Sequence, residues 1–379
     1  MEIAKRCKRF RDVIGVRQDL SEIKELIKKD QESGKGEELR RRKASQTMPY
    51  MPDLIGARSS FSRSQSFSPT ASLEFKGRIC LEGEIKNQHN NNSSILCLLI
   101  TSQGKLFSGG SDNIICAYNF NWDKREFYYD NTLSGHRNSI NNLCEMPNYN
   151  FILSCSDDKT IKMWNINNYQ CVKTYEGHNS DVNCVLALED GRVISASTDK
   201  TIKVWNEKGE CKNTLTGHSD PVRSLILSND KRIISCSSDK SVRFWDLNTL
   251  KCQNEHTIKD VPCSGNTNCT LYMPNEDKLF VGGQGVIKII DLKQYKVIGT
   301  INEGLNGKGI HSIVKLIDGS FVVCLNSNSD NIIKFDKNFK FETKVQYPQR
   351  NYTRYLIPLP NINRFVNSDN RGHIFIWEY

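Results

Sequence analysis

The chain has 379 residues, of which 37% are hydrophobic, and a formal net charge of +9. No run approaches the roughly 18 consecutive apolar residues that a membrane helix needs, and the charged N-terminus lacks the apolar stretch of a signal peptide. Fourteen cysteines are scattered from Cys7 to Cys324 without a CxxC pair, whereas zinc sites need clustered ligands. We therefore expect no membrane segment, no metal site and reduced thiols in a cytoplasmic protein, with the nucleus as the alternative.

The positive charge is concentrated at the N-terminus. Residues 1–78 hold 18 Lys and Arg against 11 Asp and Glu, a net charge of +7, and the remaining residues have a net charge of +2. A nucleic-acid-binding main domain would carry a basic surface of its own, so we do not expect one. RNA binding by the basic tail stays open as an alternative, although its aromatic residues are few and scattered.

Residues 1–30 are predicted to form a short amphipathic helix. Apolar residues recur there in steps of three and four, at Val13, Val16, Leu20, Ile23 and Ile27. Two heptads are too few to predict a coiled coil. The helix is nevertheless suited to dimerise or to contact a partner.

Residues 31–73 are rich in Ser, Arg and Gly and poor in aliphatic residues, so they are predicted to be a disordered linker. The basic run Arg40–Lys43 fits either a nuclear import signal or a solvated charge cluster. Arginines lie shortly before two of the linker's serines, a pattern that basophilic kinases favour because guanidinium groups pair with carboxylates in the kinase. Phosphorylation would allow a phosphopeptide-binding adaptor to bind the linker. The candidate phosphosites are Ser45, Ser66 and Ser68.

Repeats occupy the chain from residue 74 to its end. Three segments align, 135–165, 177–206 and 217–246, and each contains Gly-His, a strand ending in Ser-x-Ser, an Asp turn and a strand ending in Trp-Asn or Trp-Asp. The residues between the segments supply a fourth, outer strand. Weaker copies place residues 118, 290, 335 and 377 at the Trp position, so seven copies recur every 40–46 residues.

These copies resemble the WD-repeat family, most closely in the three central repeats. The resemblance implies an all-β fold over residues 74–379, a seven-bladed β-propeller of four-stranded antiparallel blades. In that family an N-terminal strand completes the last blade, and this chain stops just after the third strand of its last copy. We therefore predict that a strand near residues 76–82 pairs with the C-terminal strand, which closes the ring and removes two exposed sheet edges.

The resemblance also implies that four side chains of each central repeat form a buried hydrogen-bond chain. A catalytic or metal site would occur once, whereas a structural element recurs in every repeat, so we predict a structural role. The fifth and sixth copies lack Gly-His and are expected to depend on apolar packing and to be less rigid, and His89 lies in an Asn-rich insertion that disrupts the spacing of the first copy. The predicted sets are His136, Ser154, Asp158 and Trp164; His178, Ser195, Asp199 and Trp205; His218, Ser235, Asp239 and Trp245.

The sequence contains no phosphate-binding Gly loop, GxSxG or HExxH motif, so neither an enzyme nor a cofactor is predicted. The resemblance implies a non-catalytic scaffold or adaptor that binds partner proteins or peptides at the propeller rim. A substrate-recognition subunit of a ubiquitin ligase and an RNA-associated WD-repeat protein are the alternatives. The candidate rim residues are Asn141, Asp157, Asn183, Thr198, Arg223, Ser238 and His311.

Overall fold

The chain divides into two units, Met1–Thr70 and Ala71–Tyr379, and the second contains every residue that the computed structural model describes. These residues are 80–85, 88–89, 93–121, 126–262, 269–327, 332–345, 352–359 and 364–379. The predicted helix over 1–30, the predicted linker over 31–73 and the phosphosites Ser45, Ser66 and Ser68 lie outside them.

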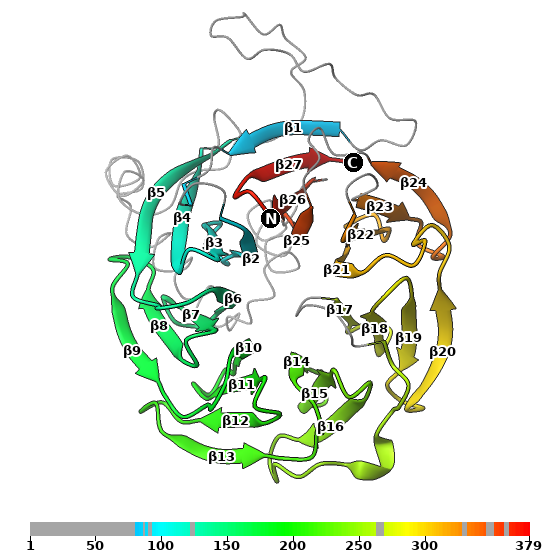
Figure 1. Ribbon diagram of the computed structural model, residues 1–379, viewed down its shortest axis with the longest axis horizontal. Helices are drawn as coiled ribbons and strands as arrows, with labels where there is room; N and C mark the ends of the chain where they lie inside the picture. Colours follow the sequence, from blue (N-terminus) through cyan, green and yellow to red (C-terminus); the bar gives the residue numbers. More distant parts are fainter. Residues whose placement is uncertain are drawn as a thin grey trace, which may run out of the picture. The chain divides into compact units, whose positions relative to one another are not determined.

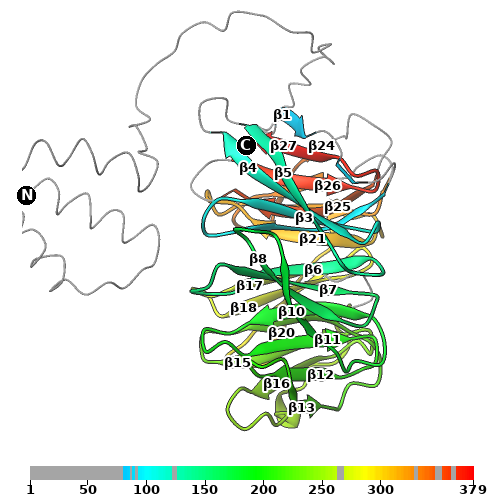
Figure 2. The same cartoon turned by 90° about the vertical axis from the view of Figure 1, so that its left-hand side faces the viewer.

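Seven separate antiparallel sheets form a ring, with the first strand of each blade on the inside and the last on the outside (Figure 1). Figure 2 shows the ring edge-on. The predicted seven-bladed all-β propeller is therefore confirmed. In chain order, blade 1 comprises β2 (Ile95–Ile100), β3 (Leu106–Gly110), β4 (Ile114–Asn121) and β5 (Glu126–Ser134); blade 2 comprises β6 (Ile140–Glu145), β7 (Phe151–Ser156), β8 (Ile161–Asn165) and β9 (Cys171–Tyr175); blade 3 comprises β10 (Val182–Ala187), β11 (Val193–Ser197), β12 (Ile202–Trp205) and β13 (Cys211–Leu215).

The other four blades follow the same plan with one exception. Blade 4 comprises β14 (Val222–Leu227), β15 (Arg232–Ser237) and β16 (Val242–Asp246); blade 5 comprises β17 (Thr270–Met273), β18 (Lys278–Gly282), β19 (Ile287–Asp291) and β20 (Lys296–Ile301); blade 6 comprises β21 (Ile310–Lys315), β22 (Phe321–Leu325), β23 (Ile332–Phe335) and β24 (Phe341–Val345); blade 7 comprises β25 (Thr353–Pro358), β26 (Arg364–Asp369), β27 (Ile374–Glu378) and β1 (Cys80–Ile85).

The fourth, outer strand predicted for every blade is wrong for blade 4. The segment after β16 makes only two isolated bridges to it, Trp245 with Cys252 and Val242 with Ile258. Between these bridges the chain forms a short 3-10 helix, η1 (Asn254–His256). The His256 ring stacks on Tyr295 of blade 5 with ring centroids 3.6 Å apart. The segment thus contacts the next blade at the point where it leaves the ladder.

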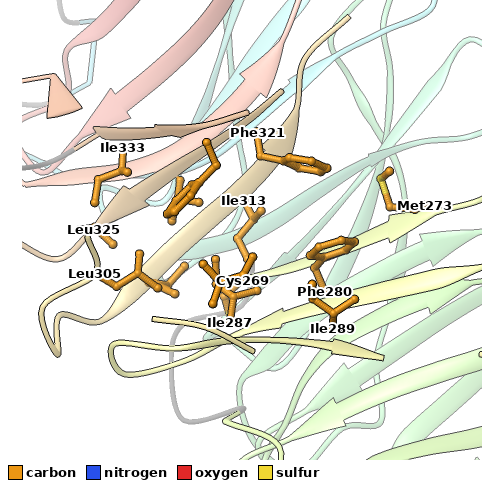
Figure 3. Close-up of a cluster of buried hydrophobic side chains, with 14 residues drawn as sticks. Cys269, Met273, Phe280, Ile287, Ile289, Leu305, Ile313, Phe321, Leu325 and Ile333 are labelled. Atoms are coloured by element: carbon orange, nitrogen blue, oxygen red, sulfur yellow. The ribbon is translucent and has the colours of Figure 1, made fainter. Parts of the chain in front are cut away.

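The blades pack against one another through apolar side chains. Figure 3 shows the cluster between blades 5 and 6, where Phe280 and Phe321 stack with ring centroids 5.5 Å apart. Neither blade has a Trp at the third-strand position, and the buried Ile290 and Phe335 take its place. The structure thus shows the apolar packing that was predicted for these two blades.

The strand β1 closes the ring. It pairs antiparallel with β27, with Ile85 opposite Ile374 and Glu84 opposite Phe375. The strand was predicted near residues 76–82; the structure places it at Cys80–Ile85, and residues 76–79 lie outside the described part. Blade 7 therefore joins the two ends of the propeller in one four-stranded sheet.

Eleven described cysteines are free, and seven of them are buried. Cys97, for example, is fully buried between blades 1 and 2 with Phe107 and Ile140. The only helix in the described ranges is η1, which is far too short to cross a membrane.

Candidate protein-interaction rim

Each central blade contains one buried His–Asp–Ser–Trp hydrogen-bond chain. In blade 3 the Asp199 Oδ2 lies 2.7 Å from His178 Nδ1, His178 Nε2 lies 2.7 Å from Ser195 Oγ, and Trp205 Nε1 donates to Ser195 Oγ over 2.8 Å. Blades 2 and 4 repeat these three distances. The structure thus brings together all four members of each predicted set, His136, Ser154, Asp158 and Trp164; His178, Ser195, Asp199 and Trp205; His218, Ser235, Asp239 and Trp245.

The backbone conformation explains why glycine precedes the histidine in the Gly-His pair. Gly177 has a φ of +146°, and a Cβ there would lie 3.4 Å from the Trp205 ring. A Cβ at that distance would make an ordinary contact, so the positive φ, which L side chains rarely adopt, is what favours glycine here.

Blade 1 forms an equivalent chain that the sequence left unassigned. His89 Nδ1 lies 2.9 Å from Asp112 Oδ1, and His89 Nε2 lies 2.8 Å from Ser108 Oγ, so the histidine comes from within the Asn-rich insertion. The Ser108 hydroxyl lies 3.5 Å from the Tyr118 hydroxyl, which stands in place of the indole. Burial opposes protonation of His89, but the hydrogen bond to Asp112, the interactions with Cys116 and the charge of Asp112 outweigh it and raise the pKa of His89 to about 9.

Blade 7 makes two of the equivalent contacts with other residues. Trp377 Nε1 donates to Asn367 Oδ1 over 2.5 Å, so an amide takes the place of serine. His373 Nδ1 lies 2.9 Å from Asp369 Oδ2, and this histidine follows the Asp turn instead of preceding it. Neither Asn367 nor His373 was predicted. Asn367 stands where the central repeats have Ser, and His373 does not precede the inner strand as the Gly-His histidines do.

The carboxylates of these chains make the fold sensitive to acid. Burial acts to raise the pKa of Asp199, but hydrogen bonds from His178, Thr201 and the Asn179 amide outweigh it and hold the pKa well below its ordinary value of 3.8. The pKa values of Asp158, Asp239 and Asp369 are lowered in the same way. In the unfolded chain these groups regain their ordinary pKa.

We expect these carboxylates to contribute fully to the free energy of unfolding above about pH 5. Their contribution should fall as the pH drops through 3.8 and below. The unfolded chain takes up protons there before the native state does. The urea midpoint of the wild type at pH 3 should lie well below that at pH 6. Asp199→Asn should be less stable than the wild type at pH 6, and its urea midpoint should fall less between pH 6 and pH 3. Equal wild-type midpoints at the two pH values would contradict this prediction.

The rim is defined here by two positions in each blade: the second residue of the inner strand and the residue just after the second strand. Because the strands are antiparallel, these positions meet at one edge of the blade, as Ile140 opposite Ser156 shows. The inner strand has a β-bulge at its second residue in six blades. A bulge redirects the side chain at that position; the bulged residues are Leu96, Asn141, Asn183, Arg223, His311 and Arg354.

In blades 2 and 3 the bulged residues link one blade to the next. Asn141 Nδ2 donates to Asp157 Oδ1 over 2.6 Å and to the Val182 carbonyl over 3.0 Å. Asn183 Nδ2 donates to Thr198 Oγ1 over 3.1 Å and to the Val222 carbonyl over 2.9 Å. These candidate rim residues therefore hold the ring together as well as lining its edge.

The other candidate rim residues lie in blades 4 and 6. Arg223 Nε donates to Ser238 Oγ over 3.0 Å, so these two residues pair within blade 4. His311 is only 7% exposed. Arg354, at the equivalent position of blade 7, was not predicted; the signal was present, since TRYLIP in β25 aligns with IHSIVK in β21.

Burial, together with the nearby Asp181 and Asp158, raises the pKa of Asp157. The rim therefore has an acidic group on blade 2 and basic groups on blades 4 and 7. No cluster of three metal-ligand side chains occurs within the described ranges.

Comparison with known proteins identifies three of the repeats. The family model of the WD domain, G-beta repeat, matches residues 128–165, 169–206 and 209–246. Each match combines the outer strand of one blade with the three inner strands of the next. One sequence repeat therefore contributes strands to two neighbouring blades. A ring of seven antiparallel blades defines a β-propeller, and the His–Asp chains recur from repeat to repeat. The three matched segments are WD repeats, and together with the seven-bladed ring they support a WD-repeat β-propeller protein.

The relatives share part of the chain only. It is 32% identical over 102 residues to a WD repeat-containing protein 89 homolog of Dictyostelium discoideum, which is 27% of each chain. It is 29% identical to Protein SOF1 of Saccharomyces cerevisiae over 29% of this chain and 23% of that protein. It is 44% identical to Nuclear distribution protein PAC1 of Candida glabrata over 14% of this chain and 11% of that protein. The matched stretch thus spans about a quarter or less of these relatives.

Proposed function

We propose that the protein is a non-catalytic scaffold or adaptor whose rim binds partner proteins or peptides. The observation that supports this most is the fixed placement of the rim side chains. Asn141 and Asn183 are held in β-bulges and by hydrogen bonds to the next blade. A surface ordered in advance lowers the entropic cost of binding.

The His–Asp pairs are structural in this proposal. Each histidine of the central blades already contacts both its aspartate and its serine, and it is almost fully buried. The same arrangement recurs in blades 2, 3 and 4, where an active site would occur once. The resemblance to WD-repeat scaffolds supports the same conclusion.

Affinity purification with mass spectrometry tests the proposal. The full-length protein is compared with a variant that removes one rim pair, Arg223→Ala with Ser238→Ala. The control removes an exposed pair at the start of the outer strand β13, Lys212→Ala with Glu210→Ala. We expect partners recovered with the wild type and the control to fall several-fold with the rim variant. Recovery of the same partners by all three proteins would contradict a rim-based scaffold.

The molecules recovered in the same purification distinguish between narrower functions. We propose a cytoplasmic location, with the nucleus as the alternative, and binding of an adaptor to the phosphorylated linker at Ser45, Ser66 or Ser68. Recovery of ubiquitin ligase subunits would favour substrate recognition. Recovery of RNA that depends on residues 1–78 and is lost at high salt would favour the RNA-associated alternative.

A further inference from the structure

Two nitrogen-bearing side chains occupy the same rim position in adjacent blades. His311 is the second residue of β21, and Arg354 is the second residue of β25. Both lie where the strand register shifts, between Ile310 and Ser312 in one blade and between Thr353 and Tyr355 in the other. The two β-bulges therefore place these side chains at the same edge of neighbouring blades.

Both side chains carry a buried polar atom without a hydrogen-bond partner. These atoms are His311 Nε2 and Arg354 Nε. The equivalent amides of Asn141 and Asn183 instead donate to carbonyls of the next blade. An unsatisfied buried donor is costly, so an acceptor bound at this point would recover hydrogen bonds that the fold leaves unmade.

His311 and Arg354 together carry one positive charge at pH 7. Burial lowers the pKa of His311 to about 4, helped by the charge of Arg354, so the imidazole is neutral at pH 7. The guanidinium of Arg354 stays charged. Among the described residues, no carboxylate forms an ion pair with it.

We propose that His311 and Arg354 bind a side-chain carboxylate of an acidic peptide in a partner protein. This inference rests on the proposed scaffold function. A guanidinium presents two parallel N–H groups that match a carboxylate. The His311 imidazole supplies another donor in the tautomer that carries its proton on Nε2 and accepts from the Asn326 amide on Nδ1. One positive charge balances one carboxylate, whereas a phosphate monoester, with a charge of about −1.5 to −2, would leave excess negative charge in a half-buried site.

The test measures binding of fluorescein-labelled hexaglutamate to the full-length protein by fluorescence anisotropy at physiological salt. Arg354→Gln is expected to weaken binding at least tenfold, and His311→Phe several-fold. The control Lys212→Gln removes an exposed cation on the outer strand and should leave the affinity unchanged. The basic N-terminal segment is common to all of these proteins, and physiological salt screens its attraction for hexaglutamate.

Arg354→Lys separates loss of fold from loss of the site. Lysine keeps the charge but lacks the paired N–H groups, so binding should be intermediate while the melting temperature stays near that of the wild type. Equal hexaglutamate affinity for wild type and Arg354→Gln would overturn the assignment, as would tighter binding of a phosphoserine peptide than of hexaglutamate. If the Arg223 rim variant still loses partners in that case, the scaffold proposal stands and only the carboxylate site fails.

Discussion

Replacement of Trp205 by alanine is expected to lower the free energy of unfolding by about 3–5 kcal/mol. The indole is 1% exposed and packs edge-on against Tyr175 of blade 2, with ring centroids 5.9 Å apart. Its removal leaves a cavity between two blades and also breaks the hydrogen bond to Ser195. Urea unfolding followed by circular dichroism at pH 7 measures the change.

Trp205→Phe is the matched control because it keeps most of the apolar volume and loses the N–H donor. It should cost about 1–2 kcal/mol, the value of a buried hydrogen bond and a smaller ring. If the phenylalanine variant were as unstable as the alanine variant, packing between the blades would not be the main contribution of this residue.

Removal of residues 1–85 should destabilise the whole ring. The truncation deletes β1, exposes β27 as an open edge and removes the buried side chain of Ile85. Five paired positions are lost, and the combined loss of about 5 kcal/mol corresponds to a fall in melting temperature of about 10 °C or more. The exposed strand edges should also cause association, because unpaired edges pair with other chains. Differential scanning calorimetry and light scattering check both effects.

A chain that begins at residue 71 is the control for this truncation. It lacks the first unit and keeps β1, so its melting temperature should match that of the full-length protein. If the two truncated chains melted at the same temperature, β1 would contribute nothing to the closure of the ring.

The sequence predicts most of the fold because the determinants are repeated. Gly-His, Ser-x-Ser, the Asp turn and the terminal Trp mark the positions of the strands in the central blades, and a repeat cannot bury its apolar surface without its neighbours. The number of blades then follows from the number of copies. The four buried side chains of blade 3, from His178 to Trp205, were located in this way.

The parts that were missed depend on contacts between distant segments. His89 completes blade 1 from an insertion whose length hides its alignment, and His373 completes blade 7 from the opposite side of its Asp turn. In blade 4 a short 3-10 helix replaces the outer strand, and its His256 contacts Tyr295 of the next blade.

The rim was only partly predictable for the same reason. Position in the repeat identified Asn141 and Arg223, but position does not show which donors the neighbouring blade has already used. Asn141 donates to the Val182 carbonyl, whereas Arg354 keeps a buried nitrogen without a partner. That difference requires the three-dimensional arrangement of two blades.

Hydrogen–deuterium exchange of the full-length protein tests the closed ring most directly. Peptides that cover β1 and β27 report on the pairing between Cys80–Ile85 and Ile374–Glu378. We predict that the paired amides of both strands exchange as slowly as those of the outer strands in blades 2 and 3. Rapid exchange of β1, at the rate of an unstructured peptide, would show an open ring and would contradict the account.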